Sequence, residues 1–142
     1  MKILLFLHGG SLNRGCEAIV RTGVAEIKTQ FPDAVIDLAS YEPETDAHLE
    51  NIHQVFRHEQ KAPKKFSWAG LKSAFFVKFF QVEKYHYQYT QKDIIAKIKN
   101  YDVFISVGGD NYCYGEQPGF YLINRLIKKA GKKLILWGAS IG

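Results

Sequence analysis

The hydrophobic and polar positions along this chain fall into short apolar runs separated by longer segments with helical spacing. Runs of four to eight apolar or β-branched residues are typical of buried strands. The runs that predict strands lie at residues 2–7, 34–39, 52–56, 103–107 and 133–137. The first run is almost continuously apolar, which is the pattern of a strand covered on both faces.

The intervening segments predict helices over residues 15–31, 93–100 and 118–130, because apolar side chains recur there every three or four positions. In the first of them the apolar positions are Val20, Val24, Ile27 and Phe31. Residues 40–51 are polar and predict a loop with at most one helical turn. Residues 66–89 are rich in aromatic residues and predict a further helix.

Alternating strands and helices indicate a parallel sheet with right-handed crossovers. We therefore predict an α/β fold with a Rossmann-like parallel sheet flanked by helices. The 142 residues form one domain, long enough to bury a substantial core.

Three of the predicted strands run directly into turns that contain glycine. The carboxyl ends of parallel strands are where α/β proteins bind ligands, and glycine there lets the backbone approach a ligand closely. We predict a substrate-binding site made by the three turns. Its candidate residues are Gly9, Gly10, Asn13, Arg14, Gly15, Gly108, Gly109, Asn111, Tyr112 and Ser140.

The first turn leads into a helix amino terminus, where free backbone N–H groups and the helix dipole favour an anion. Arg14 adds a forked donor that suits phosphate or carboxylate. The spacing of the glycines matches neither a dinucleotide fingerprint nor a P-loop. The alternative is a tight turn in which Asn13 simply caps the helix.

Two carboxylates are candidates for general acid-base chemistry at these turns. Asp110 is the first candidate and Glu17 the second, although Asp110 also suits an ordinary turn and Glu17 an ordinary first helical turn. Cys16 and Cys113 have no partner spacing, so we expect incidental thiols. The histidines show no metal-binding spacing, and we predict no metal; His8 alone lies at a strand end.

The net charge of +5 is concentrated in one part of the chain. Residues 57–99 contain ten Lys or Arg and three acidic residues, a net charge of +7. The rest of the chain therefore has a net charge of −2. Within residues 66–89 aromatic side chains and lysines interleave, which suits either a peripheral membrane contact or one stripe of core with solvated lysines. No nucleic-acid-binding module accompanies the charge. No apolar run could span a bilayer, and we expect a cytoplasmic protein, with the inner face of the membrane as a candidate location.

The turns together resemble the amino-terminal half of the polysaccharide pyruvyl transferase family. The residues that carry the resemblance are 13–19 (Asn-Arg-Gly-Cys-Glu-Ala-Ile), 102–110 ending in Gly-Gly-Asp, and 137–142 (Trp-Gly-Ala-Ser-Ile-Gly). The family commonly has Asn-x-Gly-Asp-Glu-Ala in the first turn. Cys16 stands in this chain where the family commonly has the acidic residue.

The resemblance implies a two-domain fold like the GT-B glycosyltransferases and a role in exopolysaccharide biosynthesis. It implies transfer of pyruvate, as a ketal, from phosphoenolpyruvate to a sugar of a surface polysaccharide or its lipid-linked oligosaccharide precursor, without a cofactor. The basic donor-binding residues are expected mainly in a second half. Residues 1–142 would then be the amino-terminal domain and inactive alone. The alternatives are a nucleotide-sugar glycosyltransferase of the same general fold and a non-catalytic membrane-peripheral binding module.

Overall fold

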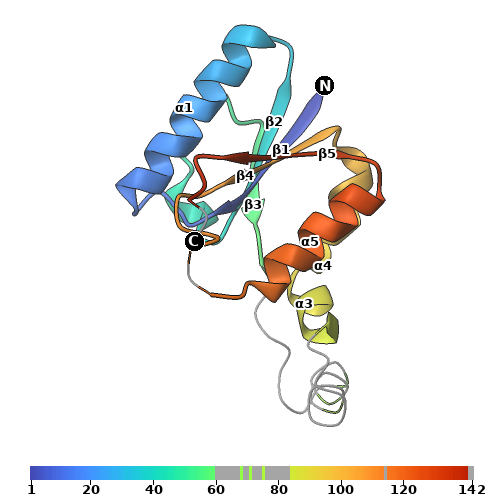
Figure 1. The fold of residues 1–142 in the computed structure, drawn as a ribbon. Coiled ribbons are helices and arrows are strands. Elements are labelled where there is room, and N and C mark those ends of the chain that lie inside the picture. Colours follow the sequence, from blue (N-terminus) through green and yellow to red (C-terminus); the bar gives the residue numbers. More distant parts are fainter. Residues whose placement is uncertain (60–67, 69–70, 72–74, 76–83, 114, 141–142) are drawn as a thin grey trace.

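The computed structural model describes residues 1–59, 68, 71, 75, 84–113 and 115–140. Within these residues the strands form one parallel sheet with the order β3-β2-β1-β4-β5 (Figure 1). They are β1 (Lys2–His8), β2 (Val35–Ser40), β3 (Gln54–Arg57), β4 (Val103–Val107) and β5 (Lys133–Trp137). The α/β Rossmann-like fold is confirmed, and each predicted strand lies within two residues of its observed position.

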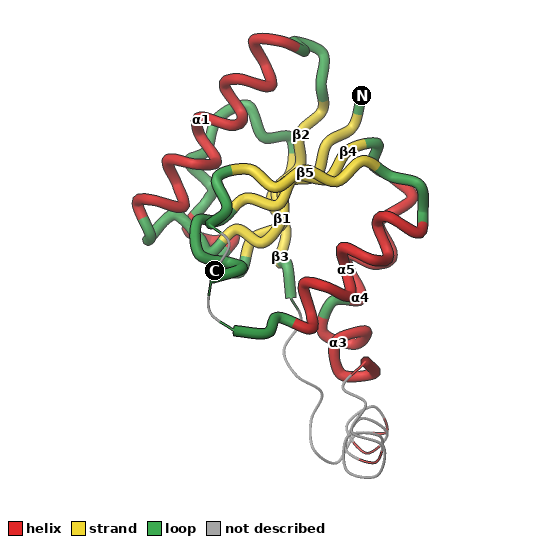
Figure 2. The backbone as a smooth tube through the Cα atoms, viewed as in Figure 1, coloured by secondary structure: helices red, strands yellow, loops and turns green. Residues whose placement is uncertain are grey.

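Helices cover both faces of the sheet (Figure 2). They are α1 (Arg14–Gln30), α3 (Lys84–Thr90), α4 (Lys92–Lys97) and α5 (Pro118–Lys129), with short 3₁₀ helices η1 (Pro43–Thr45) and η2 (Ile98–Asn100). α1 lies on one face, whereas α4 and α5 lie on the other. The predicted helix over residues 118–130 is confirmed. The turn expected in residues 40–51 is η1.

Most of the aromatic segment at residues 66–89 lies outside the described residues. Its described part includes the start of α3 and the isolated residues Trp68, Leu71 and Phe75, whose side chains are exposed. The membrane contact and the core stripe both stay predictions from the sequence. Across the part of the chain that is described, no helix combines the length and apolar character needed to cross a bilayer.

Successive side chains of the central strands point to opposite faces of the sheet, and this divides the hydrophobic core into two clusters. In β1, Ile3 and Leu5 pack toward α1, whereas Leu4 and Phe6 pack toward α4 and α5. From α1, Val20 and Val24 are buried as predicted. The helix ends at Gln30, one residue earlier than predicted, and the non-helical Phe31 that follows it is 54% exposed.

The carboxyl end of β1 departs from this alternation. Leu7 has a left-handed backbone with φ 65°, and the pairing register with β2 shifts between Leu5 and His8. Such a bulge redirects the side chains that follow it. Leu7 consequently joins Phe6 in the cluster beneath α4 and α5, and His8 becomes fully buried among polar groups.

Candidate functional site

A cavity of about 240 Å³ lies at the carboxyl ends of β1 and β4. β1 and β4 are neighbours in the sheet, and the connections leaving them run in opposite directions across it. Ligands of open α/β sheets bind at such a reversal of strand order. The cavity is lined by Gly9, Asn13, Gly15, Cys16, Ile19, Gly109, Asp110 and Asn111.

The first turn meets the cavity at the amino terminus of α1. The Asn13 side-chain oxygen accepts hydrogen bonds from the backbone N–H of Gly15 at 2.9 Å and of Cys16 at 3.2 Å. Asn13 is therefore the helix cap that one alternative predicted, and it occupies two of the donors that an anion would otherwise use. The cap also fixes the place of Cys16 in the cavity wall.

The second turn is joined by hydrogen bonds to both of the other turns. The Asn111 side-chain amide donates to the Leu7 carbonyl oxygen at 3.0 Å. The Ser140 N–H donates to the Gly109 carbonyl oxygen at 2.7 Å. A side chain at Gly108 would collide with the Asn111 amide, so only glycine fits there. Asp110 stands exposed at the cavity.

The structure does not bring every predicted site residue to this cavity. Its lining includes Gly9, Asn13, Gly15, Gly109, Asp110 and Asn111, but not Gly10, Arg14, Glu17, Gly108, Tyr112 or Ser140. The Tyr112 hydroxyl lies 3.3 Å from the Ser106 hydroxyl and accepts a hydrogen bond from the Asn124 amide at 3.1 Å. Tyr112 also packs against the core beneath α5.

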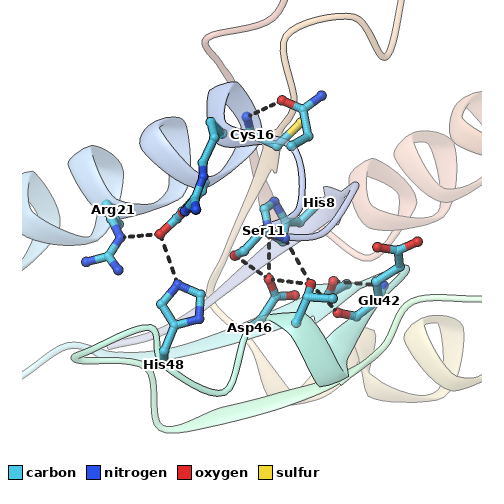
Figure 3. A network of polar contacts seen from close by, with 12 residues as sticks. His8, Ser11, Cys16, Arg21, Glu42, Asp46 and His48 are labelled. Atoms are coloured by element: carbon cyan, nitrogen blue, oxygen red, sulfur yellow. Dashed lines mark hydrogen bonds and ion pairs between the residues drawn. The ribbon is translucent and has the colours of Figure 1, made fainter.

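Glu17 lies in an ionic cluster that includes Arg21 and His48, both labelled in Figure 3. Its carboxylate is 2.9 Å from Arg14 Nη1, 2.8 Å from Arg21 Nε and 2.9 Å from His48 Nε2. Hydrogen bonds from His48, Arg21 and Arg14 lower the pKa of Glu17 to about 2. A carboxylate with so low a pKa is a weak base at neutral pH. Arg14, the cation predicted for the anion site, is 87% exposed and directed to Glu17.

Sequence reasoning missed a buried polar cluster beneath the first turn, made by His8, Ser11 and Asp46 (Figure 3). Asp46 Oδ1 accepts a hydrogen bond from Ser11 Oγ at 2.6 Å and lies 3.1 Å from His8 Nε2. Burial alone would raise the pKa of Asp46, but the hydroxyls of Ser11 and Ser40 and the adjacent His8 lower it. His8 at a strand end was the only signal in the sequence.

Comparison with known proteins shows the family to which a chain with this cavity belongs. A model of the family described as polysaccharide pyruvyl transferase matches residues 13–142. The chain belongs to the polysaccharide pyruvyl transferase family. No curated protein and no solved structure matches it. The resemblance predicted from the three turns is thereby confirmed, and the chain belongs to a family of transferases.

The match to the polysaccharide pyruvyl transferase family begins at the cap residue Asn13 and includes the turns after β4 and β5. A larger cavity of about 380 Å³ lies between α1 and β5, lined mainly by apolar side chains such as Ile27, Ile135 and Trp137. Recognition of a sugar needs several convergent polar groups. We therefore take the smaller cavity as the candidate site. Among the described residues, no group of three or more His, Cys, Asp or Glu could hold a metal ion.

Proposed function

We propose that this protein transfers pyruvate from phosphoenolpyruvate to a sugar of a surface polysaccharide or its lipid-linked precursor, forming a ketal. The observation that carries the proposal is the cavity between the turns after β1 and β4, in a chain that belongs to the family. Its volume of about 240 Å³ suits a ligand as small as one sugar unit.

The polar groups around the cavity suit a sugar acceptor. Asp110 offers a carboxylate, and Asn13 and Asn111 add amides whose own hydrogen bonds hold them in place. Gly9 and Gly109 leave the backbone accessible, so an acceptor can approach the main chain closely. A carboxylate flanked by amides binds vicinal hydroxyls by accepting and donating hydrogen bonds.

The proposed reaction joins a sugar hydroxyl oxygen to C2 of phosphoenolpyruvate while C3 gains a proton and phosphate leaves. A second hydroxyl of the same sugar then bonds to C2 and releases its proton, which closes the ketal. We assign the removal of the hydroxyl proton to Asp110, which lines the cavity. Glu17 is the second candidate, but its ion pairs make it the weaker base. Neither carboxylate acts with a cofactor in this scheme.

We further propose that this sheet corresponds to the amino-terminal half of a GT-B-like enzyme. Phosphoenolpyruvate is strongly anionic and requires several cations, and near the three turns Arg14 is already paired with Glu17. Most donor contacts would therefore come from basic residues of a second half.

We also propose a cytoplasmic location with a peripheral membrane contact through residues 66–89. Salt-sensitive co-sedimentation of the protein with anionic vesicles tests this contact.

The decisive experiment measures acceptor-dependent phosphate release from phosphoenolpyruvate by the complete encoded protein, with mass spectrometry of the sugar product. Asp110→Asn is expected to lower kcat by about 10²-fold or more, because a positioned base contributes that much. Glu116→Gln is the matched control, since this exposed acid lies in the same connection but outside the cavity lining.

Full activity of Asp110→Asn would remove Asp110 from the chemistry. Thermal stabilisation by nucleotide-sugars but not by phosphoenolpyruvate would favour the glycosyltransferase alternative and overturn the proposal. Vesicle binding with no response to either ligand would favour the non-catalytic membrane module.

A further inference from the structure

The turn that forms one wall of the cavity begins with a strained residue. Leu7 is fully buried and has φ 65°, a conformation that residues other than glycine rarely adopt. Such backbone persists only where the surrounding structure holds it, and it occurs preferentially beside functional sites. The contacts that hold the turn after Leu7 therefore bear on the geometry of the cavity.

Those contacts converge on Asp46 in the connection between β2 and β3. Asp46 Oδ1 accepts from the Ser11 hydroxyl at 2.6 Å and lies 3.1 Å from His8 Nε2. The backbone N–H of Ser11 donates to Thr45 Oγ1 at 3.0 Å. His8 and Asp46 are fully buried, and Ser11 is 5% exposed. The turn is thus tied to a segment more than thirty residues away in the sequence.

The chemistry of these groups determines which atoms carry the protons. A carboxylate oxygen only accepts, so His8 carries a proton on Nε2 and Ser11 donates its hydroxyl hydrogen. His8 Nδ1 and Asp46 Oδ2 are buried and have no hydrogen-bond partner within the part of the chain that the structure describes. Unpaired buried polar atoms cost stability. A cluster that served stability alone would be better made from apolar side chains of similar volume.

Gly10 shows how closely the turn lies against the segment that contains Asp46. It has φ 99°, and a Cβ added there would lie 2.9 Å from Glu42 Cβ. The turn therefore already packs closely against this segment. The residues on either side of the Ser11 contact, Gly9 and Asn13, both line the cavity. A shift of Ser11 away from Asp46 would move both of them.

We infer that Asp46 is a positioning residue for the transferase site: through Ser11 and His8 it fixes the turn from Gly9 to Asn13 opposite Asp110. Its effect on catalysis rests on the proposed function. Its effect on the cavity does not, because it can be measured without turnover.

Cys16 provides that measurement, since it is half-buried and lines the cavity. The probe is iodoacetamide, with mass spectrometry of both thiols, and half-buried Cys113 serves as the internal reference. In Asp46→Ala and in the milder Ser11→Ala, the ratio of Cys16 to Cys113 labelling rates is expected to rise about tenfold, the equivalent of one hydrogen bond to a charged group. Global unfolding would expose both thiols and leave the ratio near one.

The matched control is Glu44→Gln, an exposed acid of η1 that pairs with Arg57. It is expected to leave the labelling ratio unchanged. An unchanged ratio in both Asp46→Ala and Ser11→Ala overturns the inference. If Asp46→Ala fails to fold, Ser11→Ala alone decides between these outcomes.

Kinetic measurements distinguish a positioning role of Asp46 from a role in stabilising the fold alone. Displacing a binding turn by about 1 Å can lower a rate by about 10²-fold, so Asp46→Ala should lower kcat more than it raises KM. The Asp46→Ala/Ser11→Ala double variant should lose little more than Asp46→Ala alone, because Asp46→Ala already removes the contact to the Ser11 hydroxyl. Unchanged kcat in variants with fast Cys16 labelling overturns the positioning role. If the parent protein transfers no pyruvate, the proposed function fails while the labelling ratio still decides the geometry.

Discussion

Replacement of His58 by leucine is expected to remove much of the protein's sensitivity to mild acid. His58 follows β3, is fully buried, and packs with its ring centroid 4.6 Å from that of Tyr41 and 6.4 Å from that of Phe6. Neither ring nitrogen has a hydrogen-bond partner among the described residues. Burial without a partner lowers the pKa of His58 from its ordinary value of 6.5 to about 3.

The sign of the effect follows from which state binds more protons. Between pH 6.5 and about pH 3 the unfolded chain protonates His58 while the folded protein does not, so acidification favours unfolding. With these two pKa values, the loss on going from about pH 7.5 to about pH 5 is about 2 kcal/mol. Near neutral pH, His58→Leu should be neutral or stabilising, because it removes two unpaired polar atoms from the core.

The assay is urea unfolding followed by tryptophan fluorescence across this pH range, analysed as a two-state transition. The quantity of interest is the difference in unfolding free energy between His58→Leu and the parent at each pH, since contributions of the shared carboxylates and histidines cancel. The difference should grow by about 2 kcal/mol between about pH 7.5 and about pH 5. His86→Leu, at a half-buried position on α3, is the control and should keep the parent's slope. Parallel curves for His58→Leu and the parent would refute the reasoning.

Three further substitutions test contacts elsewhere in the fold by the same unfolding assay. Asn13→Ala removes the cap of α1 and should cost about 1 kcal/mol; no loss would mean that water replaces the cap. Tyr101→Phe removes the hydroxyl that donates to buried Asp37 at 2.7 Å and should cost about 1.5–3 kcal/mol, whereas a change within error would contradict a charged acceptor. Gly119→Ala should destabilise by about 1–3 kcal/mol, because its Cβ would lie 2.9 Å from the Tyr87 ring; a gain in stability would show that α3 yields easily.

The strands, α1 and α5 could be predicted from the sequence because their signals are local. An apolar run followed by glycine marks a strand and its end, and Asn13 marks the start of α1. Phe31 kept the helical spacing of its neighbours but lies beyond the last helical turn, where spacing no longer determines burial. Periodicity therefore identified the elements better than their final residues.

The polar clusters beside the cavity could not be predicted, because they join residues far apart in the sequence. Asp46 and His48 lie in a polar segment whose sequence predicts an ordinary loop. In the structure, Asp46 contacts Ser11 and His48 contacts Glu17. Glu17 was predicted from its place in the first helical turn, but its basicity depends on His48. The strain at Leu7 also has no sequence signal, since an apolar residue fits any position of a buried strand.

The contacts around Leu7 connect the two halves of the candidate site. On one side, the turn that follows Leu7 is held by Asp46 through His8 and Ser11. On the other side, the Leu7 carbonyl oxygen accepts the Asn111 amide, the residue directly after Asp110. Leu7 therefore joins the turn that carries the proposed base to the opposite wall of the cavity. A left-handed leucine persists only where its surroundings hold it, so the turn after β1 depends on a buried carboxylate that does not line the cavity.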